Sequence, residues 1–99
     1  MEKFEIFKLK AAGLSNEQVL RILAYCKEGQ FYPSLEEMAR LARCRTIIRF
    51  VEQYRQLDDD QLHKDFERFP SLSIFDPEYP EELLQIYNPP ALLFYQGDL

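Results

Sequence analysis

The spacing of apolar residues predicts that the first two thirds of this 99-residue chain form a series of short amphipathic helices. The first helix precedes Gly13, because glycine is favoured just after a helix C-terminus. Its expected apolar face consists of Phe4, Phe7, Ala11 and Leu14. Ser15 caps the second helix, with Gln18 as its capping-box partner, and Gly29 ends it. The expected apolar face of this second helix consists of Val19, Leu20, Ile22, Leu23 and Cys26.

Two further helices are predicted after a loop over residues 30–33. Ser34 caps the third helix, and Glu37 occupies the capping-box position. The residues expected to face inward from the third helix are Leu35, Met38, Leu41 and Ala42. The fourth helix begins near Arg45 or Thr46. Its expected apolar residues are Ile47, Ile48, Phe50, Val51 and Tyr54.

The pattern changes after a fifth helix, which is predicted from Asp58 to Phe66 or Phe69. Residues 71–75 form a short apolar run that is typical of a strand. Pro80 suits the first turn of a short helix that ends at Ile86, and a second apolar strand is predicted over residues 91–95. Strand, crossover helix and strand are the opening of an α/β sheet, in which strands connected in this way run parallel.

Charge is distributed unevenly along the chain. The net charge is −5 and the isoelectric point is about 4.8. Residues 1–55 contain ten Lys or Arg against seven Asp or Glu, whereas residues 56–99 contain two against ten. Affinity for nucleic acid depends largely on neutralising phosphates, so the second part of the chain is expected to repel a polyanion. This composition disfavours a stand-alone DNA-binding protein.

The sequence contains no convincing catalytic, metal or phosphate-loop motif. Cys26 and Cys44 are too few for a disulfide scaffold or a four-cysteine zinc site, and both are expected to be reduced and buried. His63 lies among charged residues on a predicted solvated helix face. The acidic run over residues 58–60 fits a helix N-terminus better than a calcium loop. Phosphate loops need closely spaced glycines, and those of this chain are far apart: Gly13, Gly29 and Gly97.

Residues 35–54 contain a second functional signal, a possible helix-turn-helix. The arginines that make this region basic are Arg40, Arg43, Arg45, Arg49 and Arg55. Against this interpretation, Ala42 and Arg43 stand where the turn usually has glycine. Three roles remain open for these arginines: a solvated structural face, a patch for a protein partner, or an auxiliary DNA contact. In the first role, Arg40 pairs with Glu36 or Glu37, and Arg49 pairs with Glu52 or with acidic neighbours of Arg45.

Residues 76–97 resemble a segment of the DNA processing protein A (DprA/Smf) family that leads into a Rossmann-like domain. The positions that carry the resemblance are Tyr79, Pro80, Leu83, Ile86, Pro89, Pro90, Leu93 and Gly97. The upstream helices are similar to the family's sterile-alpha-motif-like (SAM-like) N-terminal domain. The abundance of Tyr and Phe makes the sequence similar to those of streptococcal members.

The resemblance implies a mainly α fold. A SAM-like bundle of about five short helices is expected over residues 1–70, and a βαβ segment over residues 71–99 is expected to begin a Rossmann-like domain that is truncated at Leu99. It also implies that the full protein binds single-stranded DNA during natural transformation, protects it, helps to load the RecA recombinase and forms a homodimer. It implies no catalysis and no cofactor.

For this chain we therefore expect a non-catalytic interaction or positioning module, because the family's DNA-holding residues belong to the Rossmann-like domain. The alternative is a helix-turn-helix DNA-binding module that acts through Arg43, Arg45 and Arg49. No apolar run approaches the length of a membrane helix, and the N-terminus lacks the apolar stretch of a signal peptide. The sequence therefore predicts a cytoplasmic protein without a membrane partner.

Overall fold

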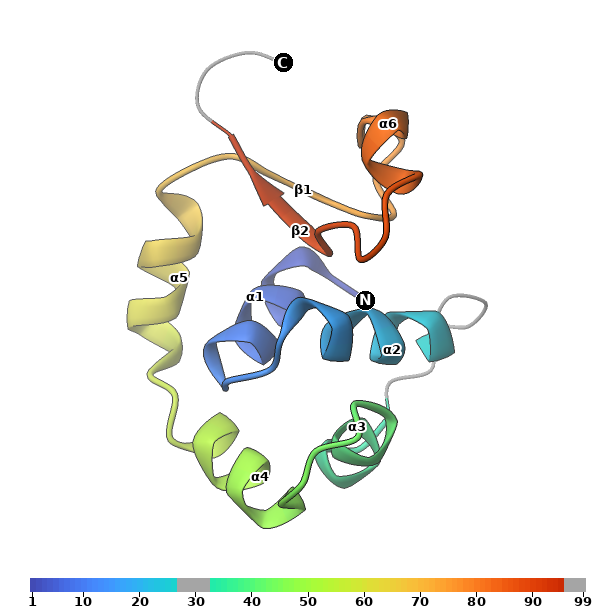
Figure 1. Cartoon of the computed structure of the whole chain (residues 1–99). Coiled ribbons are helices and arrows are strands. Elements are labelled where there is room, and N and C mark those ends of the chain that lie inside the picture. Colours follow the sequence, from blue (N-terminus) through green and yellow to red (C-terminus); the bar gives the residue numbers. More distant parts are fainter. Residues whose placement is uncertain (27–32, 96–99) are drawn as a thin grey trace.

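The computed structural model describes residues 1–26 and 33–95, and the arrangement of its elements is shown in Figure 1. The elements are α1 (Lys3–Ala11), α2 (Asn16–Cys26), α3 (Leu35–Leu41), α4 (Ile47–Arg55), α5 (Asp59–Glu67), β1 (Ser71–Ser73), α6 (Glu81–Leu84) and β2 (Leu92–Phe94). The predicted end of the second helix at Gly29 and most of the loop over residues 30–33 lie outside the described residues. None of the described helices is long and apolar enough to cross a membrane.

The predicted caps at Ser15, Ser34 and Gly13 are confirmed, whereas the Glu37 carboxylate does not complete the expected capping box with Ser34. Ser15 and Gln18 form a capping box, in which the Ser15 N–H donates to Gln18 Oε1 at 2.9 Å and the Gln18 N–H donates to Ser15 Oγ at 3.2 Å. Ser34 and Asp58 each accept the N–H of the third residue of the following helix, α3 and α5, at 3.2 Å. Gly13 ends α1 with a φ of 107°, a conformation that side-chain-bearing residues rarely adopt.

The hydrophobic core lies among α1, α2, α3, α4 and the two strands. Its buried members are Ile6, Leu9, Ala12, Leu14, Val19, Ile22, Leu23, Cys26, Met38, Ala39, Ala42, Phe50, Val51, Ala91 and Leu92. Cys26 and Cys44 are both free thiols, but only Cys26 is buried, whereas Cys44 is half-buried. Burial raises the pKa of both thiols.

The apolar face predicted for α1 is wrong in its orientation. Ile6 and Leu9 are fully buried, whereas Phe4 and Phe7 are half-buried and Ala11 is exposed. The helix has two neighbouring apolar stripes, and the aliphatic one, which contains Ile6 and Leu9, packs into the core. The aromatic stripe meets α5 and β2 through ring contacts, whose participants are Phe4, Phe7, His63, Phe66 and Phe94.

The prediction for α4 is wrong at one residue, Ile48, whose exposed fraction is 70%. Phe50 and Val51 are buried, and Ile47 and Tyr54 pack against the core. These four residues follow the three- and four-residue spacing of one helix face, whereas Ile48 is rotated about 100° from Ile47. In α2 and α3, three of the residues expected to face inward are only partly buried: Leu20, Leu35 and Leu41.

The two strands pair antiparallel, so the parallel pairing expected after a crossover helix is wrong. Ser71 lies opposite Phe94, and Ser73 lies opposite Leu92. The connection therefore leaves and rejoins the sheet at the same end, as Figure 1 shows. Backbone hydrogen bonds at both ends fix this direction: the Ile74 N–H donates to the Ala91 carbonyl at 3.0 Å, and the Tyr95 N–H donates to the Pro70 carbonyl at 3.1 Å. The predicted order of strand, helix and strand is confirmed.

The strand pair packs on the helical bundle. Ala91 and Leu92 belong to the same core as the helices, and Lys3 Nζ donates a hydrogen bond to the Ser71 carbonyl at 3.0 Å. Apolar side chains of this segment that remain exposed are Phe75, Leu84, Ile86, Tyr87 and Phe94. The division of the chain into a domain over residues 1–70 and a second one over residues 71–99 stays a prediction.

Candidate interaction surface on α3 and α4

The segment from α3 to α4 has the geometry of a tight helical turn centred on Arg43, which has a φ of 58°. The Arg43 N–H donates to the Arg40 carbonyl at 3.0 Å, and the Cys44 N–H donates to the Ala39 carbonyl at 2.9 Å. These two bonds are the pattern with which a left-handed residue closes a helix C-terminus. Glycine is therefore not required at this turn, because Arg43 adopts the conformation that glycine would supply, at a cost of roughly 1–2 kcal/mol.

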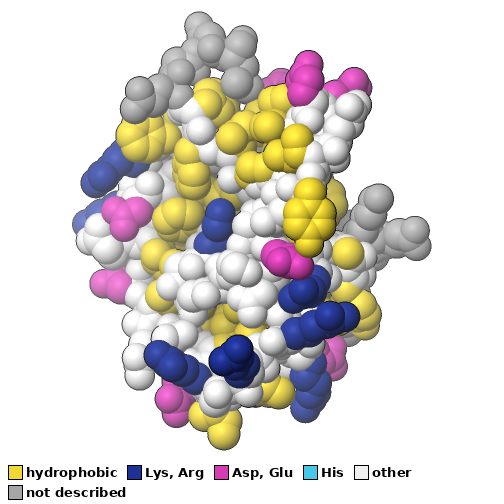
Figure 2. Space-filling model, in the orientation of Figure 1, with side chains coloured by type: hydrophobic (Ala, Val, Ile, Leu, Met, Phe, Trp, Pro, Cys, Tyr) yellow, Lys and Arg dark blue, Asp and Glu magenta, His cyan; other side chains and the backbone are white. Residues whose placement is uncertain are grey.

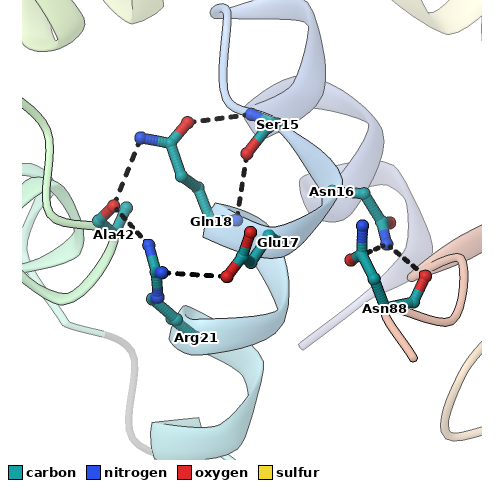
Figure 3. Close-up of polar contacts among 7 residues, drawn as sticks. All are labelled: Ser15, Asn16, Glu17, Gln18, Arg21, Ala42 and Asn88. Carbon is teal, nitrogen blue, oxygen red and sulfur yellow. Dashed lines mark hydrogen bonds and ion pairs between the residues drawn. The ribbon is translucent and has the colours of Figure 1, made fainter.

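Side chains from α2 hold this turn in place, as Figure 3 shows. Gln18 Nε2 and Arg21 Nη1 donate to the Ala42 carbonyl at 3.2 and 3.5 Å. Carbonyls at a helix C-terminus lack a partner within the helix, so donors from a neighbouring helix fix both its end and its direction. Arg21 also forms an ion pair with Glu17 at 3.0 Å. The first turn of α2 therefore positions the junction between α3 and α4.

The arginines of this surface are free of acidic partners among the residues that the structure describes. Arg40, Arg43, Arg45 and Arg49 are exposed, and their side chains form no hydrogen bond or ion pair there. The expected pairs of Arg40 with Glu36 or Glu37 and of Arg49 with Glu52 are therefore wrong. Figure 2 shows Lys and Arg side chains gathered over the α3 and α4 end of the molecule, with apolar side chains over β2 and α6 at the other end.

Arg45 and Arg49 border a groove of about 260 Å³ between the first turns of α4 and the connection from α1 to α2. The residues that line it are Ala12, Gly13, Leu14, Gln18, Cys44, Arg45, Thr46, Arg49, Phe50 and Gln53. Two of these residues are cationic, and none of them is acidic. We name this feature the arginine groove.

The family-motif residues lie on a different part of the molecule. Tyr79 is buried, and its hydroxyl donates to the Pro90 carbonyl at 2.7 Å. Burial raises the pKa of this phenol. Pro80 precedes α6 as its N-cap. The other described motif residues are half-buried or exposed: Leu83, Ile86, Pro89 and Leu93. Gly97 lies outside the described residues.

The sequence prediction missed Asn16, which joins α2 to the loop before β2 (Figure 3). Its amide nitrogen donates to Asn88 Oδ1 and to the Pro89 carbonyl, both at 2.8 Å. Its amide oxygen accepts the N–H of Ala91, which is fully buried, at 2.8 Å. Figure 3 also shows that Asn88 and Ala42 approach α2 from opposite sides. One helical turn thus connects the α3–α4 junction with the family-motif loop.

Replacing Asn16 by alanine is expected to lower the free energy of unfolding by about 1–3 kcal/mol. The reason is that the buried N–H of Ala91 loses its acceptor. Urea denaturation measures the change, and amide exchange at Ala91 localises it. Glu17→Ala is the matched control, because its exposed pair with Arg21 contributes at most about 1 kcal/mol. Equal stabilities of the two variants would contradict the structural role of Asn16.

A polar cluster fixes α4 against α1 and α5. The Tyr54 hydroxyl donates to Glu5 at 2.5 Å, and Lys8 forms an ion pair with Asp59 at 2.8 Å. The Lys8 ammonium also lies 4.6 Å from the centre of the Tyr54 ring. Burial, followed by the hydrogen bond and the charge of Glu5, raises the pKa of Tyr54 above its usual range. These contacts hold the C-terminal half of α4 against α1.

The residues considered for catalysis or metal binding form no such site in the described part of the chain. His63 is exposed, as predicted, and its ring stacks on Phe4 with centres 3.7 Å apart. The acidic run lies at the N-terminus of α5, as predicted: Asp58 is the N-cap, and Asp59 pairs with Lys8. Among the described residues, no group of three His, Cys, Asp or Glu side chains is placed to bind a metal.

Comparison with known proteins identifies the chain's family. The family model for the DNA processing protein A sterile alpha motif domain matches residues 1–62, which include α1 to α4 and the start of α5. The chain belongs to the DNA processing protein A (DprA) family. This confirms the resemblance seen in the residues from Asp76 onward and the SAM-like fold of the helices before them.

A sequence and a crystal structure, both of DprA from Streptococcus pneumoniae, show how much of the family's length this chain represents. It is 45% identical over 96 residues to the DNA processing protein DprA of Streptococcus pneumoniae, which covers 97% of the chain and 34% of that relative. The X-ray structure of DprA from Streptococcus pneumoniae matches with a TM-score of 0.94 and 43% identity, over 99% of the chain and 35% of that structure. The chain therefore spans about a third of the length of the DprA proteins it matches.

Proposed function

We propose that the chain is the N-terminal interaction or positioning module of a protein that binds single-stranded DNA during natural transformation. The whole protein protects the incoming strand and helps to load the RecA recombinase onto it. It acts as a homodimer in the cytoplasm, without catalysis or a cofactor. Membership of the DprA family supports this proposal, as does the name of the Streptococcus pneumoniae relative, which is a DNA processing protein.

One observation carries the proposal of a positioning role. The chain matches one third of a DprA structure almost completely, with a TM-score of 0.94. The family resemblance implies that the residues that hold DNA belong to the Rossmann-like domain. The helical third of the protein therefore has a different role. The contacts of Asn16 support this role, because they fix α2 against the segment that leads into that domain. Gln18 and Arg21 hold the junction between α3 and α4 against the same helix.

A second candidate function is a helix-turn-helix module that reads duplex DNA through Arg43, Arg45 and Arg49. The turn at Arg43 and the unpaired arginines favour it. The orientation of α4 weighs against it, because Arg45 and Arg49 border a groove formed with the connection between α1 and α2. A recognition helix instead presents its first residues outward to the base edges of a major groove.

The proposal is tested with a protein of the relatives' full length that begins with this chain. We expect it to protect a labelled single strand from nuclease and to accelerate RecA-catalysed strand exchange on DNA covered by single-strand-binding protein. The same protein without the chain's residues is the control, and it should bind the strand but lose part of the acceleration. A full-length protein that neither protects the strand nor affects RecA would overturn the proposal.

A further inference from the structure

We propose that the arginine groove binds the sugar-phosphate backbone of single-stranded DNA without reading its sequence. This inference rests on the proposed function, since it assumes a protein that handles single strands. It extends that function by placing an additional strand contact on the helical module itself.

The lining of the groove is suited to an anion. Arg45 lies two residues before α4 and Arg49 lies in its first turn, and both border the groove. Thr46, Gln18 and Gln53 add neutral polar groups, and no acidic side chain lines the groove to compete for the guanidinium groups. Arginine is the side chain that matches the oxygens of a phosphate with two parallel hydrogen bonds.

The arginines of the groove are available for a ligand. In the described part of the chain, the three ion pairs are Lys8–Asp59, Arg21–Glu17 and Arg68–Asp65, and none of them involves α4. An exposed cation without an internal partner can exchange its counterions for a phosphate, and the release of those counterions favours binding. The ligand therefore does not have to displace an existing ion pair.

The shape of the groove favours a single strand over a duplex. Its volume is about 260 Å³, and it is bordered on one side by α4 and on the other by the turn at Gly13. A flexible strand can place one or two phosphates between these walls. A duplex requires a helix that projects into its major groove, which is about 12 Å wide.

The groove provides charge but no platform for bases. Phe50 is its one aromatic residue, and it is almost completely buried, with an exposed fraction of 4%. Proteins that bind single strands tightly add stacking of bases on exposed aromatic rings. Contact through the backbone alone predicts binding that is weak, insensitive to sequence and steeply dependent on salt.

The test is a fluorescence-anisotropy titration of the 99-residue chain with a labelled oligothymidylate of about 20 nucleotides, over a salt series that starts near 50 mM. Arg45→Gln combined with Arg49→Gln should lower the affinity at least tenfold. It should also reduce the slope of log affinity against log salt by about 1.4, which is about 0.7 for each lost phosphate contact. Arg55→Gln is the matched control for the single variant Arg49→Gln, because each removes one positive charge from α4 and only Arg49 borders the groove. Arg55→Gln should lower the affinity less than about threefold.

The remaining outcomes each overturn the proposal. Equal losses of affinity in Arg55→Gln and in the groove variants would mean that binding depends on the total positive charge of this region and not on the groove. Competition by polyglutamate as strong as by unlabelled oligothymidylate would assign the groove to an acidic protein segment. Preference for one duplex sequence would favour the helix-turn-helix interpretation. A chain that binds no oligothymidylate at low salt would refute the groove contact alone, because the proposed function is tested separately with the longer protein. Circular dichroism of each variant excludes unfolding as the cause of any loss.

Discussion

Leu23→Ala is expected to lower the free energy of unfolding by roughly 2–5 kcal/mol. Leu23 has an exposed fraction of 2% and lies in α2, at the centre of the core that joins the helices and the strands. Removing three carbons leaves a cavity, because the surrounding helices are tied by their caps and by the contacts of Asn16 and can close only partly. Domains of this size are commonly stable by only 5–15 kcal/mol, so the loss should be visible in urea denaturation.

Ile48→Ala is the control for this prediction, because it truncates a branched aliphatic side chain of α4 that is 70% exposed. We expect it to change stability by no more than about 0.5 kcal/mol. The loss of stability in Leu41→Ala should lie between those of Leu23→Ala and Ile48→Ala, since Leu41 is only partly buried. If Leu23→Ala and Ile48→Ala have the same urea midpoint, the assignment of the core is wrong.

The chain alone is expected to bind single-stranded DNA at least a hundredfold more weakly than a protein of the relatives' full length that begins with it. The arginine groove offers a small number of phosphate contacts, and residues 56–99 contain ten acidic residues against two basic ones. In the proposed function, most phosphate contacts are made by the Rossmann-like domain. A hundredfold difference corresponds to about 2.7 kcal/mol, the equivalent of a few such contacts.

Parallel titrations of both proteins at physiological salt measure this difference. The longer protein without the chain's residues should retain most of the affinity, which separates a contribution of the chain from that of the remainder. An affinity of the chain within tenfold of the longer protein would contradict the prediction. It would show that the helical module is itself the main binding surface for DNA.

Local signals in the sequence were sufficient for the helix boundaries. Ser15 and Ser34 cap their helices as predicted, and Asp58 lies at the start of α5 as predicted, because an N-cap depends on one side chain and on backbone groups two or three residues away. The end of α1 at Gly13 is equally local. The family motif could also be recognised from sequence, since it depends on residue types at fixed spacings, and the match of the family model to the preceding helices agrees with it.

The candidate site could be predicted only in part. The basic composition of the segment from Arg40 to Arg49 was evident, but its groove was not, because the groove depends on how α4 lies against the connection from α1 to α2. Arg43 illustrates the same point. Its left-handed conformation accompanies the two hydrogen bonds that close α3 and the contacts of α2 with the Ala42 carbonyl, against the preference of the residue itself.

What the sequence determined by itself was therefore the helical nature of the chain, its caps, the order of its elements and its family. Only the tertiary structure decided which stripe of α1 enters the core, that Ile48 faces solvent and that β1 and β2 run antiparallel. It also decided that Asn16 connects α2 with the family-motif loop. The physical reason is range: caps and periodicity are interactions between residues close in sequence, whereas burial, strand direction and the contacts of Asn16 join residues up to 75 positions apart.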